Sequence, residues 1–138
     1  MPTREELDTR QRFTGRYREN RTAVVEQIER AVIGGDLGAN GYTTIGQADR
    51  LADALQLGPG DRLLDLGAGR GWPGLYLALG TGCRVVLTDV PPEGLRLAVL
   101  RAGAEHVARR VAAVASTARS LPFRGGSFDA VVHTDVLC

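Results

Sequence analysis

The sequence contains no lysine, and all 17 of its basic residues are arginine. We interpret this absence as the codon bias of a GC-rich genome, since no site chemistry would exclude lysine from every position. The 16 acidic residues nearly balance the arginines and leave a net charge of +1. This balance argues against a dominant surface for nucleic acid or for an anionic membrane.

Cysteine and histidine are scarce, with two of each. Cys83 and Cys138 lack C-x-x-C spacing, so we expect neither a structural zinc site nor a disulfide framework, and we predict no metal site. The first residues, MPTREELDTRQR, are charged where a signal peptide needs an apolar stretch, and no run approaches membrane-spanning length. The sequence therefore predicts a soluble protein of the cytoplasm without membrane contact.

What the sequence does contain is a change of apolar period near residue 62. Before it, apolar residues fall at helical spacing over 3–33 and again after residue 45, where a helix should end at Gly58. After it, four short apolar strands alternate with helices, and their sequences are RLLDL (62–66), RVVLTD (84–89), RRVAAVA (109–115) and FDAVVH (128–133). Such alternation predicts a single α/β domain whose parallel sheet is covered on both faces.

Three glycines, Gly67, Gly69 and Gly71, follow the first of these strands. Ligands of open parallel sheets bind beyond the carboxyl ends of the strands, and residues without a Cβ let a ligand approach the backbone closely. A tight strand-to-helix turn needs the same glycines without any ligand. The third glycine of a dinucleotide fingerprint would stand at Trp72, which disfavours an NAD(P)-dependent oxidoreductase.

Asp89 ends the second strand, where a carboxylate can accept hydrogen bonds from both ribose hydroxyls of an adenosine. The alternative is that Asp89 caps the helix that follows Pro91 and Pro92. The glycines beside it favour the ribose interpretation.

These motifs together resemble those of class I S-adenosylmethionine-dependent methyltransferases. LLDLGAGRG is similar to the first motif of that family, RVVLTDV to the second, and ARSLPFRGGSFDAVV to the segment that joins its third and fourth strands. The resemblance covers about residues 42–138. It implies a Rossmann-like open parallel sheet in a three-layer αβα arrangement, preceded by N-terminal helices, and S-adenosyl-L-methionine as the cofactor.

The resemblance also implies roles for individual residues. Asp65 would support the ammonium of the ligand, the loop at Gly67, Ala68, Gly69 and Gly71 would pack against its methionine part, Asp89 would hold the ribose, and Val90 would lie against the adenine. Thr117 stands where the family often has an aspartate for the adenine amino group, and the backbone of Ala118 would assist it.

Further candidates follow from position. His133, at the end of the fourth strand, is either a general base or only a backbone contact for the methionine part. Asp135 either touches an acceptor or caps a helix. Tyr42 either closes over the cofactor or packs at the sheet edge. We accordingly divide the chain into residues 1–58, helices with a lid segment, and 59–138, the first half of the cofactor domain.

Sheets of this family normally have seven strands, whereas the sequence ends just after the fourth. A fragment of a longer enzyme, a natural truncation and completion of the sheet by another molecule all remain open, and we favour the fragment. We expect a methyltransferase that acts on a small molecule. The alternative is a non-catalytic module that self-associates through the unpaired edge of its fourth strand.

Overall fold

The structure is a computed structural model that describes residues 1–18, 22–39 and 41–136. In chain order its elements are α1 (Arg4–Arg18), α2 (Ala23–Val32), α3 (Ile45–Leu55), β1 (Arg62–Leu66), α4 (Gly74–Thr81), β2 (Arg84–Asp89), α5 (Pro92–Ala104), the 3₁₀ turn η1 (Ala108–Arg110), β3 (Val111–Ala115) and β4 (Ala130–His133). Within the described ranges, every helix is too short or too polar to cross a bilayer.

The four strands form one parallel sheet in the order β3-β2-β1-β4. Leu66 of β1 lies beside Thr88 of β2 and His133 of β4, so the carboxyl ends of the strands meet at one edge. The chain moves outward from β1 through β2 to β3 and then returns to the other side of β1. This reversal of strand order is where open sheets bind ligands, and the predicted Rossmann-like fold is confirmed.

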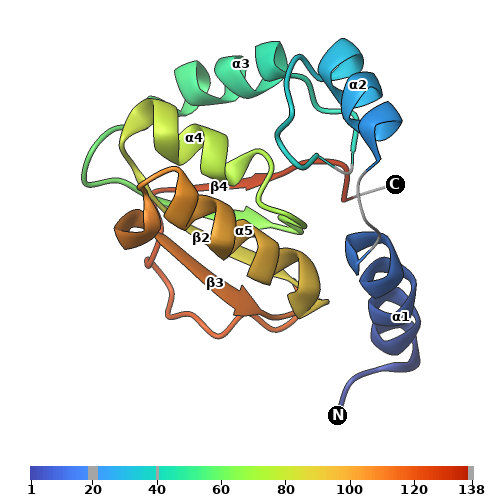
Figure 1. The fold of residues 1–138 in the computed structure, drawn as a ribbon. Coiled ribbons are helices and arrows are strands. Elements are labelled where there is room, and N and C mark those ends of the chain that lie inside the picture. The colour runs from blue at the N-terminus through green and yellow to red at the C-terminus, as the bar shows by residue number, and fades with distance from the viewer. Residues whose placement is uncertain (19–21, 40, 137–138) are drawn as a thin grey trace.

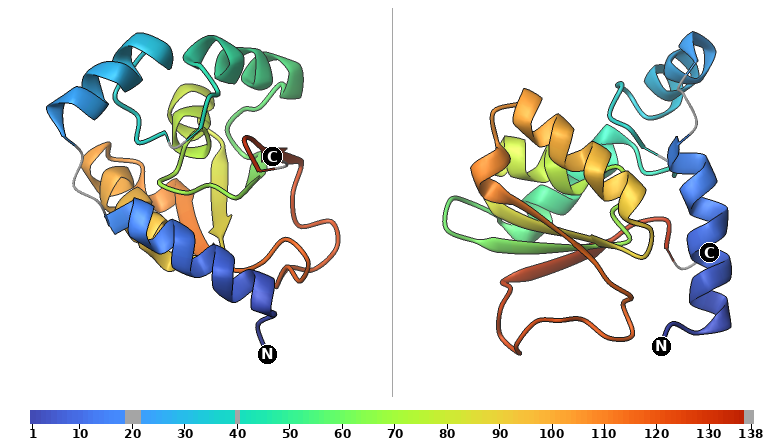
Figure 2. Two further views of the ribbon diagram at one scale, coloured as in Figure 1. Left: turned by 90° about the vertical axis from the view of Figure 1, so that its right-hand side faces the viewer. Right: turned by 60° about the horizontal axis from the view of Figure 1, so that its bottom comes forward.

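Helices α4 and α5 lie on one face of the sheet, with α3 beyond α4 (Figure 1). The connection from β3 to β4 runs along the other face, where the described residues form no helix (Figures 1 and 2). The sheet and the helices on its one face therefore form two of the three expected layers. Helix α1 stands at the edge toward which the strand arrowheads point (Figure 1).

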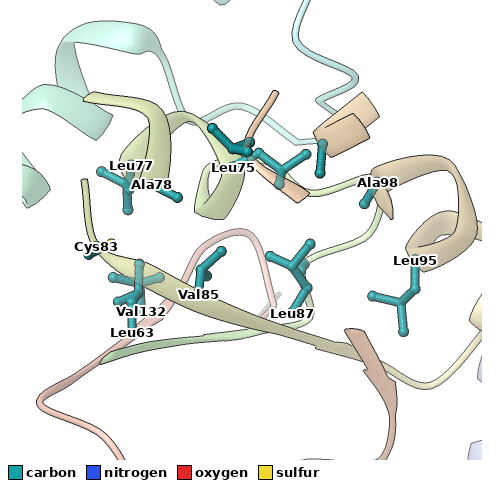
Figure 3. Close-up of a cluster of buried hydrophobic side chains, with 13 residues drawn as sticks. Leu63, Leu75, Leu77, Ala78, Cys83, Val85, Leu87, Leu95, Ala98 and Val132 are labelled. Carbon is teal, nitrogen blue, oxygen red and sulfur yellow. The ribbon is translucent and has the colours of Figure 1, made fainter. Parts of the chain in front are cut away.

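The main core lies between the sheet and these two helices (Figure 3). Alternate strand residues point toward the helices, because side chains alternate between the two faces of a sheet. The labelled side chains that meet there are Leu63, Val85, Leu87 and Val132 from the strands and Leu75, Leu77, Ala78, Leu95 and Ala98 from the helices. This packing fixes the β1–α4 loop against the sheet.

The helix expected over residues 3–33 is two helices, α1 and α2. Thr22 has extended backbone angles, and its hydroxyl accepts a hydrogen bond from the Val25 N–H at 3.3 Å, which caps the start of α2. A threonine before an apolar helical run is a start signal, so this break was readable from the sequence.

The outer edge of β4 has no strand beside it among the described residues, and Val131 on β4 is 51% exposed. Self-association through this edge stays a prediction.

Candidate cofactor site

A cavity of about 590 Å³ opens at the carboxyl edge of the sheet, beneath α1. It has the size of ordinary small-molecule sites. The segments that follow all four strands line it, and so does α1. The predicted site residues that it brings together are Gly67, Ala68, Gly69, Asp89, Val90, Thr117, Ala118 and Asp135.

The first part of the glycine-rich loop forms the floor of this cavity. Gly67 and Gly69 have φ angles of +70° and +54°, in the left-handed region that L side chains rarely adopt. A Cβ on Gly67 would lie 2.5 Å from Val136 Cγ2, and one on Gly69 would lie 3.1 Å from the hydroxyl of Tyr17. The floor is therefore backbone without side chains, and the side chains of Val136 and Tyr17 lie close to it.

Asp89 lies half-buried at one side of this floor. Its Oδ2 accepts hydrogen bonds from the N–H of Gly69 at 2.8 Å and from the hydroxyl of Tyr17 at 3.1 Å, and its Oδ1 accepts one from the N–H of Val90 at 2.7 Å. Burial raises the pKa of Asp89, and these three donors act to lower it. Asp89 thus ties the glycine loop to β2 and still lines the cavity.

Asp65 does not line the cavity. It lies on the same face of the sheet as Leu63, only 1% exposed, and its Oδ2 accepts a hydrogen bond from the N–H of Gly74 at 2.9 Å, at the start of α4. Burial raises the pKa of Asp65 well above its ordinary value of 3.8. The structure therefore places Asp65 under the loop, where it caps the start of α4, and its support of a ligand's ammonium stays a prediction.

Gly71 also faces the core rather than the cavity. Its φ is +97°, and a Cβ there would lie 2.7 Å from Leu75 Cδ1 and 3.0 Å from the Cβ of Ala98. Gly71 thus lets α4 and α5 approach each other and does not line the cavity, and its contact with the methionine part of a ligand stays a prediction.

His133 and Tyr42 lie outside the cavity as well. His133 lines a separate, shallower cavity of about 340 Å³ together with residues of α3. The side chain of Tyr42 is 84% exposed. Neither residue lines the cavity beneath α1, and their contacts with a cofactor stay predictions.

Asp135 lines the cavity and also forms hydrogen bonds with the loop before α3. Its Oδ2 accepts hydrogen bonds from the N–H of Tyr42 at 3.1 Å, the N–H of Thr43 at 3.2 Å and the hydroxyl of Thr43 at 2.9 Å. In this arrangement Asp135 positions the loop that closes one side of the cavity.

Sequence reasoning missed the wall that α1 contributes. Tyr17 is the buried residue of this helix, at 6% exposure, and it lines the cavity. Burial and the Asp89 carboxylate raise its pKa, so the phenol remains a hydrogen-bond donor. Charged residues dominate the sequence of α1, and one tyrosine among them gave no periodic signal.

Polar contacts with Arg70, Glu93 and Arg119 hold α1 over the cavity. Arg70 donates to the backbone oxygens of Arg16 at 2.9 Å and Tyr17 at 3.4 Å. Glu93, at the start of α5, accepts from the hydroxyl of Thr14 at 3.2 Å and pairs with Arg18 at 3.3 Å. At the other end of the helix Arg119 pairs with Glu5 at 2.8 Å.

Ser116 supplies a polar atom that fits a ligand. It lines the cavity, and its buried Oγ has no hydrogen-bond partner among the described residues. A buried hydroxyl without a partner is costly, so a ligand that reaches this oxygen would complete its hydrogen bonding. No group of three His, Cys, Asp or Glu side chains in the described ranges is arranged to hold a metal ion.

Comparison with known families tests the resemblance. A family model described as a methyltransferase domain matches residues 64–138, more than half of the chain. The chain belongs to this family. The match confirms the resemblance that the sequence predicted, and it includes the glycine-rich loop, Asp89 and the segment after β3 of this methyltransferase domain.

Curated relatives of the domain include methyltransferases of greater length. It is 37% identical over 83 residues to the 27-O-demethylrifamycin SV methyltransferase of Amycolatopsis mediterranei, an alignment that covers 60% of this chain and 30% of that protein. It is 44% identical over 79 residues to the demethylmenaquinone methyltransferase of Mycolicibacterium vanbaalenii, covering 57% and 31%. The chain thus spans about a third of the length of these relatives.

A solved structure that resembles the domain is that of the geranyl diphosphate C-methyltransferase of Streptomyces coelicolor A3(2), crystallised with Mg²⁺, geranyl diphosphate and S-adenosyl-L-homocysteine. The TM-score is 0.71 at 22% identity, and the match covers 95% of this chain and 54% of that one. At this identity the likeness establishes the fold alone, and its coverage includes the N-terminal helices.

Proposed function

We propose that the chain is the cofactor-binding part of an S-adenosyl-L-methionine-dependent methyltransferase that acts on a small molecule. The observation that carries the proposal is a cavity floored by bare glycine backbone, with the Asp89 carboxylate at its side and the unpaired Ser116 oxygen in its wall. Membership of the methyltransferase domain family supports the same assignment.

The residues present fit an adenosyl ligand. Asp89 stands at the end of β2, where its carboxylate can accept the ribose hydroxyls, and Val90 follows it against the cavity. Ser116, Thr117 and Ala118 follow β3 and offer a hydroxyl, a second hydroxyl and a backbone N–H to the adenine edge.

When bound, S-adenosyl-L-methionine supplies a methyl carbon that is already electrophilic because it is attached to a sulfonium. Its transfer depends on positioning and on exclusion of water more than on acid–base groups. The structure offers both through Asp135, which positions the loop at Tyr42 and Thr43, and through α1, which closes the cavity from above. We assign no proton transfer to His133, since it does not line this cavity.

A small molecule is the proposed acceptor because two relatives are named after 27-O-demethylrifamycin SV and demethylmenaquinone. The net charge of +1 also gives little attraction for nucleic acid. We further propose that the protein works in the cytoplasm.

Calorimetric titration tests the cofactor assignment. We expect the chain to bind S-adenosyl-L-methionine and S-adenosyl-L-homocysteine but not NAD. The variant Asp89→Ala should lose at least about 30-fold in affinity, because it removes a charged acceptor of two hydroxyl groups. Asp53→Ala, an exposed aspartate on α3, is the matched control and should bind as the wild type does.

Two results would contradict the proposal. One is binding of NAD in preference to the adenosyl sulfonium; the other is a folded chain, as judged by circular dichroism, that binds no adenosyl ligand. In the second case a mass above the monomer in solution would support the self-associating module instead.

A further inference from the structure

The hydroxyl of Tyr17 forms a hydrogen bond with Asp89, whose carboxylate the proposed function assigns to the ribose. It donates to Asp89 Oδ2 at 3.1 Å, on the same oxygen that accepts the Gly69 N–H at 2.8 Å. Tyr17 and Asp89 are 72 positions apart in the sequence. A side chain of α1 therefore stands at the point of the cavity where a ligand needs an acceptor.

The hydrogen-bonding capacity of Asp89 makes this contact consequential. A carboxylate offers about four lone-pair positions. The described donors already fill three of them: the N–H groups of Gly69 and Val90 and the hydroxyl of Tyr17. One position remains, whereas the vicinal hydroxyls of a ribose need two.

Among these three donors, only Tyr17 can leave without dismantling the fold. The N–H of Val90 belongs to the residue next to Asp89, and the N–H of Gly69 belongs to a loop whose neighbour, Ala68, bonds to the oxygen of Thr88 at 2.9 Å. The Tyr17 hydroxyl, in contrast, is at the tip of a side chain of α1, outside the sheet and its glycine loop.

The ring of Tyr17 lies in a seat made by two glycines. A Cβ on Gly69 would lie 3.1 Å from its hydroxyl, and a Cβ on Gly94, at the start of α5, would lie 3.1 Å from its Cδ2 and 2.6 Å from the oxygen of Gly69. The contacts of Arg70 and Glu93 hold α1 above this seat. The phenol is thus fitted into the cavity by surfaces that have no side chains of their own.

We infer that Tyr17 sets the affinity of the adenosyl site by competing with the ribose for Asp89, so that the ligand must displace the Tyr17 hydroxyl to bind. This inference rests on the proposed function, because it takes Asp89 to be the ribose acceptor. The hydroxyl keeps the half-buried carboxylate hydrogen-bonded in the ligand-free chain, and the ribose then takes over that role.

The test is calorimetric titration of the full chain and of Tyr17→Phe with S-adenosyl-L-homocysteine. Phenylalanine keeps the ring in its glycine seat and removes only the competing hydroxyl. We expect the variant to bind about tenfold more tightly, because the ligand no longer has to break a hydrogen bond to a charged group.

Tyr76→Phe provides the matched control. Tyr76 also donates its hydroxyl to a carboxylate, Asp49 Oδ1 at 2.7 Å, but it does not line the cavity beneath α1. Its removal should leave the affinity for S-adenosyl-L-homocysteine unchanged. A gain in both variants would point to a general effect of losing a phenol and would overturn the inference.

A second measurement follows the displacement itself. In protein labelled with 3-fluorotyrosine, the ¹⁹F resonance that is lost in Tyr17→Phe should shift on addition of S-adenosyl-L-homocysteine, and the resonances of Tyr42 and Tyr76 should not. Binding by the wild type with equal or weaker binding by Tyr17→Phe would overturn the inference and leave the cofactor assignment standing. Failure of both proteins to bind would overturn the cofactor assignment, and the inference with it.

Discussion

The two halves of the glycine-rich segment 67–74 look alike in sequence and serve different parts of the molecule. Gly67 and Gly69 lie on the floor of the cavity, where added Cβ atoms would meet Val136 and Tyr17. Gly71 and Gly74 lie in the core, where added Cβ atoms would meet Leu75 in one case and Asp65 in the other. One half of the loop forms the floor of the cavity, and the other half makes room for the packing of α4.

Each half is held by its own carboxylate. Asp89 accepts the N–H of Gly69 at 2.8 Å on the cavity side, and Asp65 accepts the N–H of Gly74 at 2.9 Å on the core side. The exposure of the two differs accordingly, because Asp89 is half-buried and lines the cavity while Asp65 is 1% exposed. A glycine or an acid in this motif therefore says little about ligand contact until its packing is known.

The largest effect that would sharpen this comparison is expected for Gly71→Ala. Alanine at a φ of +97°, with its Cβ 2.7 Å from Leu75 Cδ1, combines backbone strain with overpacking. We expect the free energy of unfolding to fall by about 2–4 kcal/mol, measured by urea denaturation. Retention of full stability would place Gly71 outside the core and break the distinction between the two halves.

Gly80→Ala is the control for this variant. Gly80 lies in α4, and a Cβ there would have no heavy atom within 4 Å. Because alanine is the better helix former, this change should raise stability by about 0.5–1 kcal/mol.

The next effect concerns the pH dependence of Asp65. Because its pKa is raised in the folded state, its protonated form stabilises the fold fully below pH 3.8, and this contribution is lost as the pH rises through the raised pKa. Asp65→Asn removes the titration. Between pH 3.8 and the raised pKa, the free energy of unfolding of the variant should therefore increase relative to that of the wild type by up to about 1.4 kcal/mol per pH unit, and the difference should stay constant above that range.

Urea denaturation at a series of pH values measures this difference. A constant offset between the two proteins is expected from the new amide hydrogens, so the slope with pH is the quantity that matters. Parallel curves would mean that Asp65 is solvated and belongs with Asp89 on the cavity side.

Much of the fold was predictable because its signals are local. Mainly apolar runs of five to seven residues marked all four strands, and the meeting of their carboxyl ends brings Gly67, Gly69 and Asp89 to one cavity. The predicted strand ends were less accurate. The 3₁₀ turn at 108–110 includes the first two residues of the predicted strand 109–115, so β3 begins at Val111.

The rest of the site depends on contacts that leave no local pattern. Tyr17 reaches Asp89 across 72 positions of sequence, and a helix rich in arginine and glutamate gave no sign of a buried residue. The separation of Asp65 from Asp89 required knowing which face of the sheet α4 covers. His133 lies at the expected strand end, yet neighbours from α3 place it on a different cavity.

The smallest effect that would sharpen the comparison concerns two unpaired oxygens, one on each side of the loop. Asp65 Oδ1 on the core side and Ser116 Oγ on the cavity side both lack hydrogen-bond partners among the described residues. Only Ser116 can gain a partner from a ligand, since it lines the cavity. Ser116→Ala should thus raise the stability of the ligand-free chain by about 1 kcal/mol, because it removes a buried unpaired hydroxyl.

The same variant should bind S-adenosyl-L-homocysteine about three- to tenfold more weakly, because the hydrogen bond that the ligand would make is lost. Thermal unfolding and calorimetric titration measure the two effects, and Ser120→Ala, at an exposed position outside the cavity, is the control. A gain in stability together with a loss of affinity would show that the Ser116 oxygen forms a hydrogen bond with the ligand and not within the protein. Equal affinity in both variants would assign the Ser116 oxygen to the protein interior, and the cavity wall after β3 would then contribute shape but no hydrogen bond.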